Sequence, residues 1–201
     1  MNLSLLILLP LLTALLILLS KNLAQIRVIG LAGSLAQLGA AGLLLKLFMD
    51  QRAAGNTATY LFETNTVWFK ALNINYHIGI DGIALAMILL SALVVVAGIL
   101  VSWTMEKLSK EYFFLLVLLS MGAYGFFISL DLFTLFFFLE VAVIPKFLLI
   151  GIWGGPNKIY AAFKFFLYTL LGSLLMLVAL IYLYNVSGGS FDLATWHRLP
   201  L

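Results

Sequence analysis

The chain has 201 residues, of which 64% are hydrophobic and 9% charged, with a formal net charge of +3 and no cysteine. A soluble globular domain carries about 25% charged residues, so this composition excludes a water-soluble body and indicates a lipid environment. The lack of cysteine excludes disulfides, thiolate metal sites and cysteine-ligated iron–sulfur clusters. The basic residues are scattered singly, which argues against a nucleic-acid partner.

The apolar runs predict an all-α fold, a polytopic transmembrane bundle of about six helices in a single membrane domain, 1–201. A membrane span needs about 20 apolar residues, with a range of roughly 17 to 25. The expected helices cover residues 3–19, 28–49, 82–103, 112–129, 132–153 and 159–184. A polar loop, 50–78, separates the second helix from the third.

The first run contains Pro10 and is short for a span. It lacks the basic n-region and the small-residue cleavage site of a signal peptide, so we interpret it as a true helix with a modest kink at the proline. The second run is rich in small residues, which let helix backbones approach closely in lipid. Its glycines are Gly30, Gly33, Gly39 and Gly42.

The polar loop alternates in hydrophobicity around "TVWFKALNINYHIGI", which is consistent with a short amphipathic hairpin. Asp81 stands just before the third helix and Asp131 just before the fifth, where each carboxylate is expected to cap free backbone N–H groups. The turn of Leu130 and Asp131 makes the fourth and fifth helices antiparallel neighbours. His77 and His197 are far apart and form no metal-ligand spacing, so we expect no metal site.

The distribution of basic residues predicts that the N-terminus lies outside, because Lys and Arg accumulate in cytoplasmic loops. The opposite set of alternate loops holds Arg52, Lys70 and Arg198, spread over long segments where this rule is weak. The loops assigned to the inside hold Lys21, Arg27, Lys107, Lys110 and Lys158.

Three ionisable residues fall inside the last two expected helices: Glu140, Lys146 and Lys164. Each costs roughly 3 kcal/mol at mid-helix on the insertion scale, and such residues mark ion pathways and proton relays. The structural alternative is a polar anchor that pins two helices together. We therefore treat Glu140, near the middle of the fifth helix, as the leading functional candidate.

Helical geometry separates these groups. Lys146 follows Glu140 by six residues and lies about 120° away on the same helix, so the partner of Glu140 must come from another helix. Lys164 shares a polar stripe with Tyr168 and Gly172, which we expect to face the bundle interior. Lys146 is left open between an inward position and snorkelling to the interface.

A proline follows the carboxylate. Pro145 has no N–H, which leaves the carbonyl of Val141 without its helical donor. A freed carbonyl beside a buried carboxylate offers a place for water, as a proton path would need. Membrane prolines also often only bend a helix, so Pro145 is a supporting feature.

The segments "LDLFTLFFFLEVAVIPKFLLIGIWGG" and "YAAFKFFLYTLLGSLLML" resemble the fifth and sixth helices of the chain M (subunit 4) family of proton-translocating NADH–quinone oxidoreductase, complex I. "GIDGIALAMILLSALV" resembles the opening of its third helix. These antiporter-like subunits are shared with multisubunit cation/proton antiporters and membrane-bound hydrogenases.

The resemblance implies that Glu140 is the proton carrier, paired with a lysine on a seventh helix. Lys164 is a further candidate for a charge partner or relay, whereas Lys146 stands where many relatives have an uncharged residue. Moving an ammonium toward or away from a carboxylate changes its proton affinity, which can drive proton uptake and release. A subunit of a multisubunit cation/proton antiporter or of a membrane-bound hydrogenase, and a structural membrane scaffold, remain alternatives.

The resemblance also sets expectations for the setting of the chain. The family has about fourteen helices, so the expectation is that this chain is the N-terminal part of a longer protein, as a fragment or a truncation. It would act as a translocase subunit of the enzyme and bind no NADH, flavin or cluster itself. Its partners would be the other membrane subunits, the lipid bilayer and protons, in the multi-pass environment of the inner (cytoplasmic) membrane.

Overall fold

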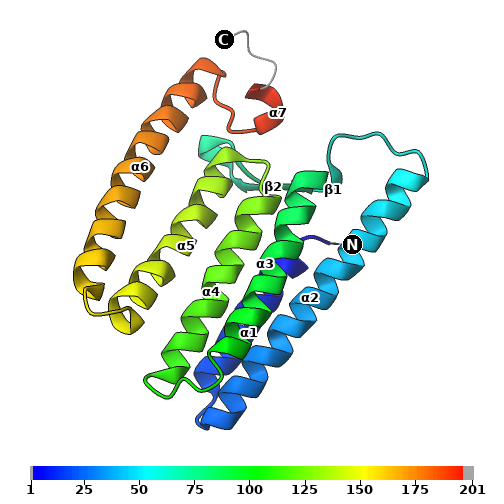
Figure 1. Cartoon of the computed structure of the whole chain (residues 1–201). Helices are drawn as coiled ribbons and strands as arrows, with labels where there is room; N and C mark the ends of the chain where they lie inside the picture. The colour runs from blue at the N-terminus through cyan, green and yellow to red at the C-terminus, as the bar shows by residue number, and fades with distance from the viewer. Residues whose placement is uncertain (1, 197–201) are drawn as a thin grey trace.

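A computed structural model describes residues 2–196 of the chain, so His197 and Arg198 lie outside the described residues. Six long helices follow one another up and down, in the arrangement that Figure 1 shows. They are α1 Leu5–Leu19, α2 Leu23–Ala53, α3 Gly82–Val101, α4 Ser109–Ile128, α5 Leu132–Trp153 and α6 Lys158–Val186. The expected helix bundle is confirmed, and α5 has the same bounds as expected.

Five of the six helices, α2 to α6, are long and apolar enough to cross a membrane. The exception is α1, which has 15 residues and at 1.5 Å per residue extends about 22 Å. A bilayer core is about 30 Å thick. The helix continues through Pro10 without interruption, so the first run is a helix as expected, and a kink at the proline stays a prediction.

Helix α4 is the centre of the bundle, with α1, α2, α3 and α5 packed around it. Two glycines allow α5 to approach it closely. A Cβ at Gly122 would lie 2.9 Å from the backbone nitrogen of Ala142, and one at Gly125 would overlap the ring of Phe138. Because α5 carries Glu140, these two glycines set the position of the candidate site relative to the rest of the bundle.

The small residues of α2 have different environments. A Cβ at Gly33 would overlap Thr13 of α1, so this glycine is needed for the close approach of the two helices. Gly30 leaves room for ordinary contacts, and a Cβ at Gly39 or Gly42 would meet nothing within 4 Å. The expectation of close packing is therefore confirmed at Gly33 and wrong at Gly39 and Gly42.

The polar loop forms the expected hairpin, made of the antiparallel strands β1 Leu61–Phe69 and β2 Ile74–Ile80. A 3₁₀ turn, Lys70–Leu72, joins the strands. The hairpin lies across one end of the bundle (Figure 1). There, Leu130 N–H of the α4–α5 turn donates to the carbonyl of His77 in β2, at 2.8 Å.

The segment after α6 returns to the same end of the bundle. Leu132 N–H donates to the carbonyl of Phe191 at 2.9 Å, and Leu193 N–H donates to the carbonyl of Leu130 at 3.0 Å. A short helix, α7 Leu193–Trp196, follows. The α4–α5 turn is thus held between the hairpin and the end of the described chain.

The connections 20–22, 102–108 and 154–157 lie at the opposite end of the bundle, because each follows a helix that runs away from the hairpin. The basic residues assigned to inside loops cluster at this end. Two bonds tie helices α5 and α2 to the 102–108 connection: Trp153 Nε1 donates to the carbonyl of Lys107 at 2.8 Å, and Arg27 donates to the carbonyl of Met105 at 3.3 Å. Which end faces the cytoplasm stays a prediction.

Candidate functional site

Glu140 lies half-buried on α5 and faces α6. The hydroxyl of Ser173 on α6 donates a hydrogen bond to Glu140 Oε1. The hydrogen-bond partner of Glu140 thus comes from another helix, as the geometry of α5 required, whereas a charge partner for Glu140 stays a prediction. No pattern in the sequence distinguishes Ser173 from the other polar side chains of α6 as this partner.

Apolar layers border the Glu140–Ser173 pair along the seam between α5 and α6. On one side, the ring centre of Phe147 lies 5.3 Å from that of Phe166 and 6.0 Å from that of Phe163. On the other, Phe136 packs against the buried cluster that includes Leu180. The carboxylate and the hydroxyl thus form a polar pair within an aromatic and aliphatic seam, and no ion pair within residues 2–196 includes Glu140.

Lys146 lies on a different side of α5. It is half-buried and lines a groove of about 500 Å³ between α3, α4 and α5, whose other lining residues include Ala142, Leu116 and Phe126. This placement confirms that Lys146 and Glu140 do not share a face of the helix. The groove lies between helices, in keeping with an inward position for Lys146, and whether its ammonium snorkels to the interface stays a prediction.

Lys164 is exposed on the outer surface of α6, and the expectation that its stripe faces the interior of these helices is wrong. Its ammonium lies 5.7 Å from the ring centre of Tyr160 and 6.0 Å from that of Tyr168, and Tyr168 is 68% exposed. Such contacts stabilise a cation over an aromatic face. Gly172, on the same stripe, is also open, with nothing within 4 Å of a Cβ built there.

The periodicity of α6 explains this outcome. Ala162 and Leu180 are buried and Ser173 bonds to Glu140, so the inward face passes through these three positions. Lys164 follows Ala162 by two residues, about 200° around the helix. Only α5 packs extensively on α6, and 6% of the most apolar stretch of α6 is buried, so the face that carries Lys164 is uncovered by the described residues.

Pro145 is buried within α5, which continues on both sides of it to Trp153. The missing N–H therefore does not end the helix. The proposed water at the carbonyl of Val141 stays a prediction.

Both expected caps are present. The carboxylate of Asp81 accepts from Ala84 N–H at 2.7 Å at the start of α3. The carboxylate of Asp131 accepts from Phe133 N–H and Thr134 N–H, each at 3.0 Å, at the start of α5. These bonds satisfy N–H groups that lack helical partners.

Asp131 does more than the sequence indicated. Its second oxygen accepts from Asn75 N–H in β2 at 3.3 Å, which ties the hairpin to α5. The residue is 1% exposed. Burial raises the pKa of this carboxyl above its ordinary value, while the backbone hydrogen bonds from Thr134, Asn75 and Phe133 act in the opposite direction and offset part of the increase.

His77 of β2 lies near two acidic residues, a cluster that the sequence did not reveal because its members are far apart in the chain. Its Nδ1 is 3.3 Å from Asp192 Oδ1, and its Nε2 is 3.9 Å from Glu63 Oε1. Within residues 2–196, no three His, Cys, Asp or Glu side chains are grouped to hold a metal ion.

Comparison with known proteins identifies the same family as the sequence motifs. Residues 129–198, which include α5 and α6, match the family model described as NADH:quinone oxidoreductase/Mrp antiporter, TM. NADH-quinone oxidoreductase subunit M of Rhodobacter capsulatus is 42% identical over 127 residues, which cover 63% of this chain and 24% of that protein. NADH-ubiquinone oxidoreductase chain 4 of Marchantia polymorpha is 39% identical over 189 residues, covering 93% of this chain and 38% of that protein.

The fold is also similar to that of a solved respiratory complex. A chain of respiratory complex I from Thermus thermophilus with bound NADH superposes with a TM-score of 0.82 and 27% identity, covering 99% of this chain and 39% of that chain. The resemblance to the antiporter-like subunits is therefore confirmed. The chain spans between 24% and 38% of the length of the two curated relatives named above.

Proposed function

We propose that this chain, which is similar over most of its length to the antiporter-like subunits of respiratory complex I, is a proton-translocating part of an NADH–quinone oxidoreductase. The observation that carries the proposal is the hydrogen bond between Ser173 and Glu140 in the α5–α6 seam. An ionisable group at this depth is costly and is retained for ion or proton transfer. Glu140 is the proposed proton carrier.

The Glu140–Ser173 pair can accommodate both protonation states of the carboxyl group. An ionised carboxylate accepts hydrogen bonds, whereas a protonated one also donates. The hydroxyl of Ser173 is both a donor and an acceptor and can rotate, so it can donate to ionised Glu140 and accept from protonated Glu140. Ser173 is therefore a positioning residue that keeps the carboxyl group oriented while a proton arrives and leaves.

The charge that drives Glu140 comes, in this proposal, from outside the described helices. Lys146 lines another groove and Lys164 faces outward, so neither ammonium contacts the carboxylate. A cation on a further helix or subunit would change the proton affinity of Glu140 as it moves. The partners would be the other membrane subunits of a complex in the inner (cytoplasmic) membrane, with the redox cofactors held by those subunits.

The Glu140→Gln variant tests this function in the assembled complex, reconstituted into vesicles. The amide keeps the shape of the side chain and removes the titrating proton, so we expect loss of NADH-driven proton pumping with normal assembly. Glu111→Gln, at an exposed position in the first turn of α4, is the matched control and should pump normally. Undiminished pumping in Glu140→Gln contradicts the proposal, and failed assembly favours a structural scaffold.

The family model that matches α5 and α6 also covers Mrp antiporters, so a cation/proton antiporter subunit is the second candidate. The same vesicles separate the two. Proton uptake driven by NADH oxidation supports the redox complex, whereas proton movement driven only by a sodium or potassium gradient supports the antiporter.

A further inference from the structure

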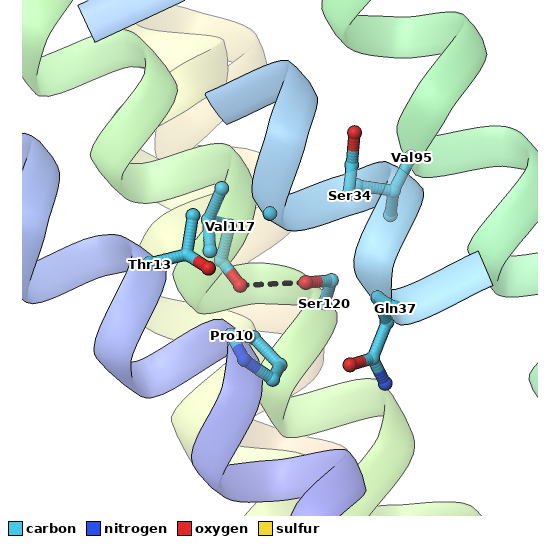
Figure 2. A pocket seen from close by; sticks show the side chains of 8 residues that line it. Pro10, Thr13, Ser34, Gln37, Val95, Val117 and Ser120 are labelled. Carbon is cyan, nitrogen blue, oxygen red and sulfur yellow. Dashed lines mark hydrogen bonds between the residues drawn. The ribbon is translucent and has the colours of Figure 1, made fainter. Parts of the chain in front are cut away.

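A second polar site lies away from Glu140, between α1, α2, α3 and α4. Figure 2 shows a small cavity there, lined by polar side chains in an otherwise apolar bundle. Four of its polar residues are at least nine-tenths buried, and they come from three different helices. They are Thr13, Ser34, Gln37 and Ser120, with exposures of 5%, 4%, 3% and 4%.

Pro10 explains why a glutamine is placed here. Proline has no N–H, so the carbonyl of the residue four positions earlier, Leu6, lacks its helical donor. Gln37 Nε2 on α2 donates to this Leu6 carbonyl at 3.1 Å. The amide nitrogen of Gln37 therefore bonds across to α1, and this bond fixes which end of the amide turns toward the cavity.

The oxygen of the same amide accepts no hydrogen bond from residues 2–196. In Figure 2 the amide oxygen of Gln37, Oε1, is turned toward Pro10 and the cavity, and the amide nitrogen of the same side chain points the other way. This oxygen is buried. A buried acceptor without a partner is destabilising, so a donor from outside the chain is expected.

The neighbouring hydroxyls cannot supply that donor, because each already donates to its own helix. Thr13 Oγ1 donates to the carbonyl of Leu9 at 2.8 Å, and Ser34 Oγ to that of Leu31 at 2.9 Å. Ser120 Oγ donates to the carbonyl of Val117 at 2.7 Å. With their protons committed, the hydroxyl oxygens, like Gln37 Oε1, can only accept.

The cavity thus selects a small ligand that donates hydrogen bonds. Its volume is about 10 Å³, measured as the space open to the centre of a water molecule, and about 10–15 Å³ of such space holds one water. A metal cation fits poorly, because the lining has no carboxylate and an unpaired ion in an apolar interior carries a far larger desolvation cost than water.

We propose that this cavity binds one structural water molecule, which donates to Gln37 Oε1 and to a hydroxyl oxygen of the lining. The water extends the chain of bonds that begins at the Leu6 carbonyl of α1 and passes through the Gln37 amide of α2. Val95 and Ser120 also line the groove that contains Lys146, so these two residues separate the cavity from the groove.

Hydroxyl-radical footprinting of the full chain in its membrane assembly tests the proposal, because radiolysis of a bound water oxidises buried side chains beside it. We expect oxidation at Pro10 and Val117, which line the cavity. Ile88 and Ile99, both 0% exposed and outside the cavity lining, serve as dry controls. If Pro10 and Val117 are as unreactive as these isoleucines, the proposal is overturned.

The Ser34→Thr variant provides a second measurement. It keeps a hydroxyl and adds a methyl group about as large as a water molecule, whose share of liquid volume is about 30 Å³. We expect oxidation at Pro10 and Val117 to fall to the control level and the thermal unfolding midpoint to decrease, since Gln37 Oε1 loses its donor. Gly39→Ala adds a methyl where nothing lies within 4 Å and controls for the added group.

Two other outcomes would refute a bound water. A higher unfolding midpoint in Ser34→Thr would mean that the methyl fills an empty apolar space. Oxidation at Pro10 and Val117 that appears only after sodium is removed would mean that a cation, not water, occupies the cavity.

Discussion

The position of the candidate site depends on the contact between α4 and α5, and Gly122→Ala tests that contact directly. A Cβ at Gly122 would lie 2.9 Å from both the Cβ and the backbone nitrogen of Ala142, and 3.0 Å from the carbonyl oxygen of Phe138. Two of these three atoms are backbone, so rotation of a side chain cannot relieve the overlap. Helix α5, which carries Glu140, must move away.

The expected magnitude follows from two opposing effects. In a helix, alanine is more favourable than glycine by about 1 kcal/mol, whereas an extra methyl in a well-packed core costs about 1–3 kcal/mol. Gly39→Ala on α2 gains the first effect without the second, because a Cβ there meets nothing within 4 Å. The two variants should therefore differ in unfolding free energy by about 1–3 kcal/mol, with Gly122→Ala the less stable.

Chemical unfolding in detergent or lipid, followed by tryptophan fluorescence, measures this difference, and proton pumping by the assembled complex measures its effect on the site. We expect Gly122→Ala to lose pumping because Glu140 moves with α5, and Gly39→Ala to retain it. Equal stability of the two variants would refute the reasoning, since it would show that α4 and α5 are not in the close contact described.

Two further variants test single polar contacts. Ser173→Ala removes the donor to Glu140, and a hydrogen bond to a charged group is worth roughly 1.5–3 kcal/mol, so we expect pumping to slow. Ser173→Thr retains a hydroxyl and should keep more of the activity. Equal pumping rates in the two variants would contradict the positioning role. For Asp131, burial raises the folded-state pKa above the ordinary value of 3.8, so its contribution to stability is present below about pH 4 and is lost as the pH rises through the raised pKa. Asp131→Asn should remove this pH dependence from the unfolding free energy, although it also loses the bond from Asn75 N–H. An unchanged pH dependence would contradict the assignment of the raised pKa to Asp131.

Elements that depend on local sequence could be predicted closely. The predominantly apolar run of 22 residues between Asp131 and Gly154 predicted the bounds of α5. The position of each aspartate before an apolar run predicted the two caps. Helix α2 is longer than expected, Leu23–Ala53 rather than 28–49, because polar residues such as Gln25 and Arg52 continue a helix beyond its apolar part. Hydropathy marks the lipid-facing length of a helix and not its ends.

Contacts between helices could not be predicted in the same way. The stripe of Lys164, Tyr168 and Gly172 is the most polar on α6, and polarity alone suggested that it faces inward. The neighbours of a helix decide its inward face, and α6 packs on α5 through Ala162, Ser173 and Leu180. The hydrogen-bond partner of Glu140, Ser173, was therefore not predicted. That it comes from another helix did follow from the separation of about 120° between Glu140 and Lys146 around α5.

Two faces of α6 together define what the proposed proton site at Glu140 requires. Ser173 on the inward face supplies a neutral hydroxyl, which orients Glu140 but carries no charge. Lys164 on the outer face is exposed and lies over Tyr160 and Tyr168, so it stays on the far side of the helix from the carboxylate. If Glu140 is the proton carrier, a cation that controls it must approach the α5–α6 seam from a surface that residues 2–196 leave uncovered. The group that orients the carboxyl, Ser173, is thus separate from the cation that changes its charge environment. Substitutions at Ser173 and at that cation should therefore affect pumping in different ways.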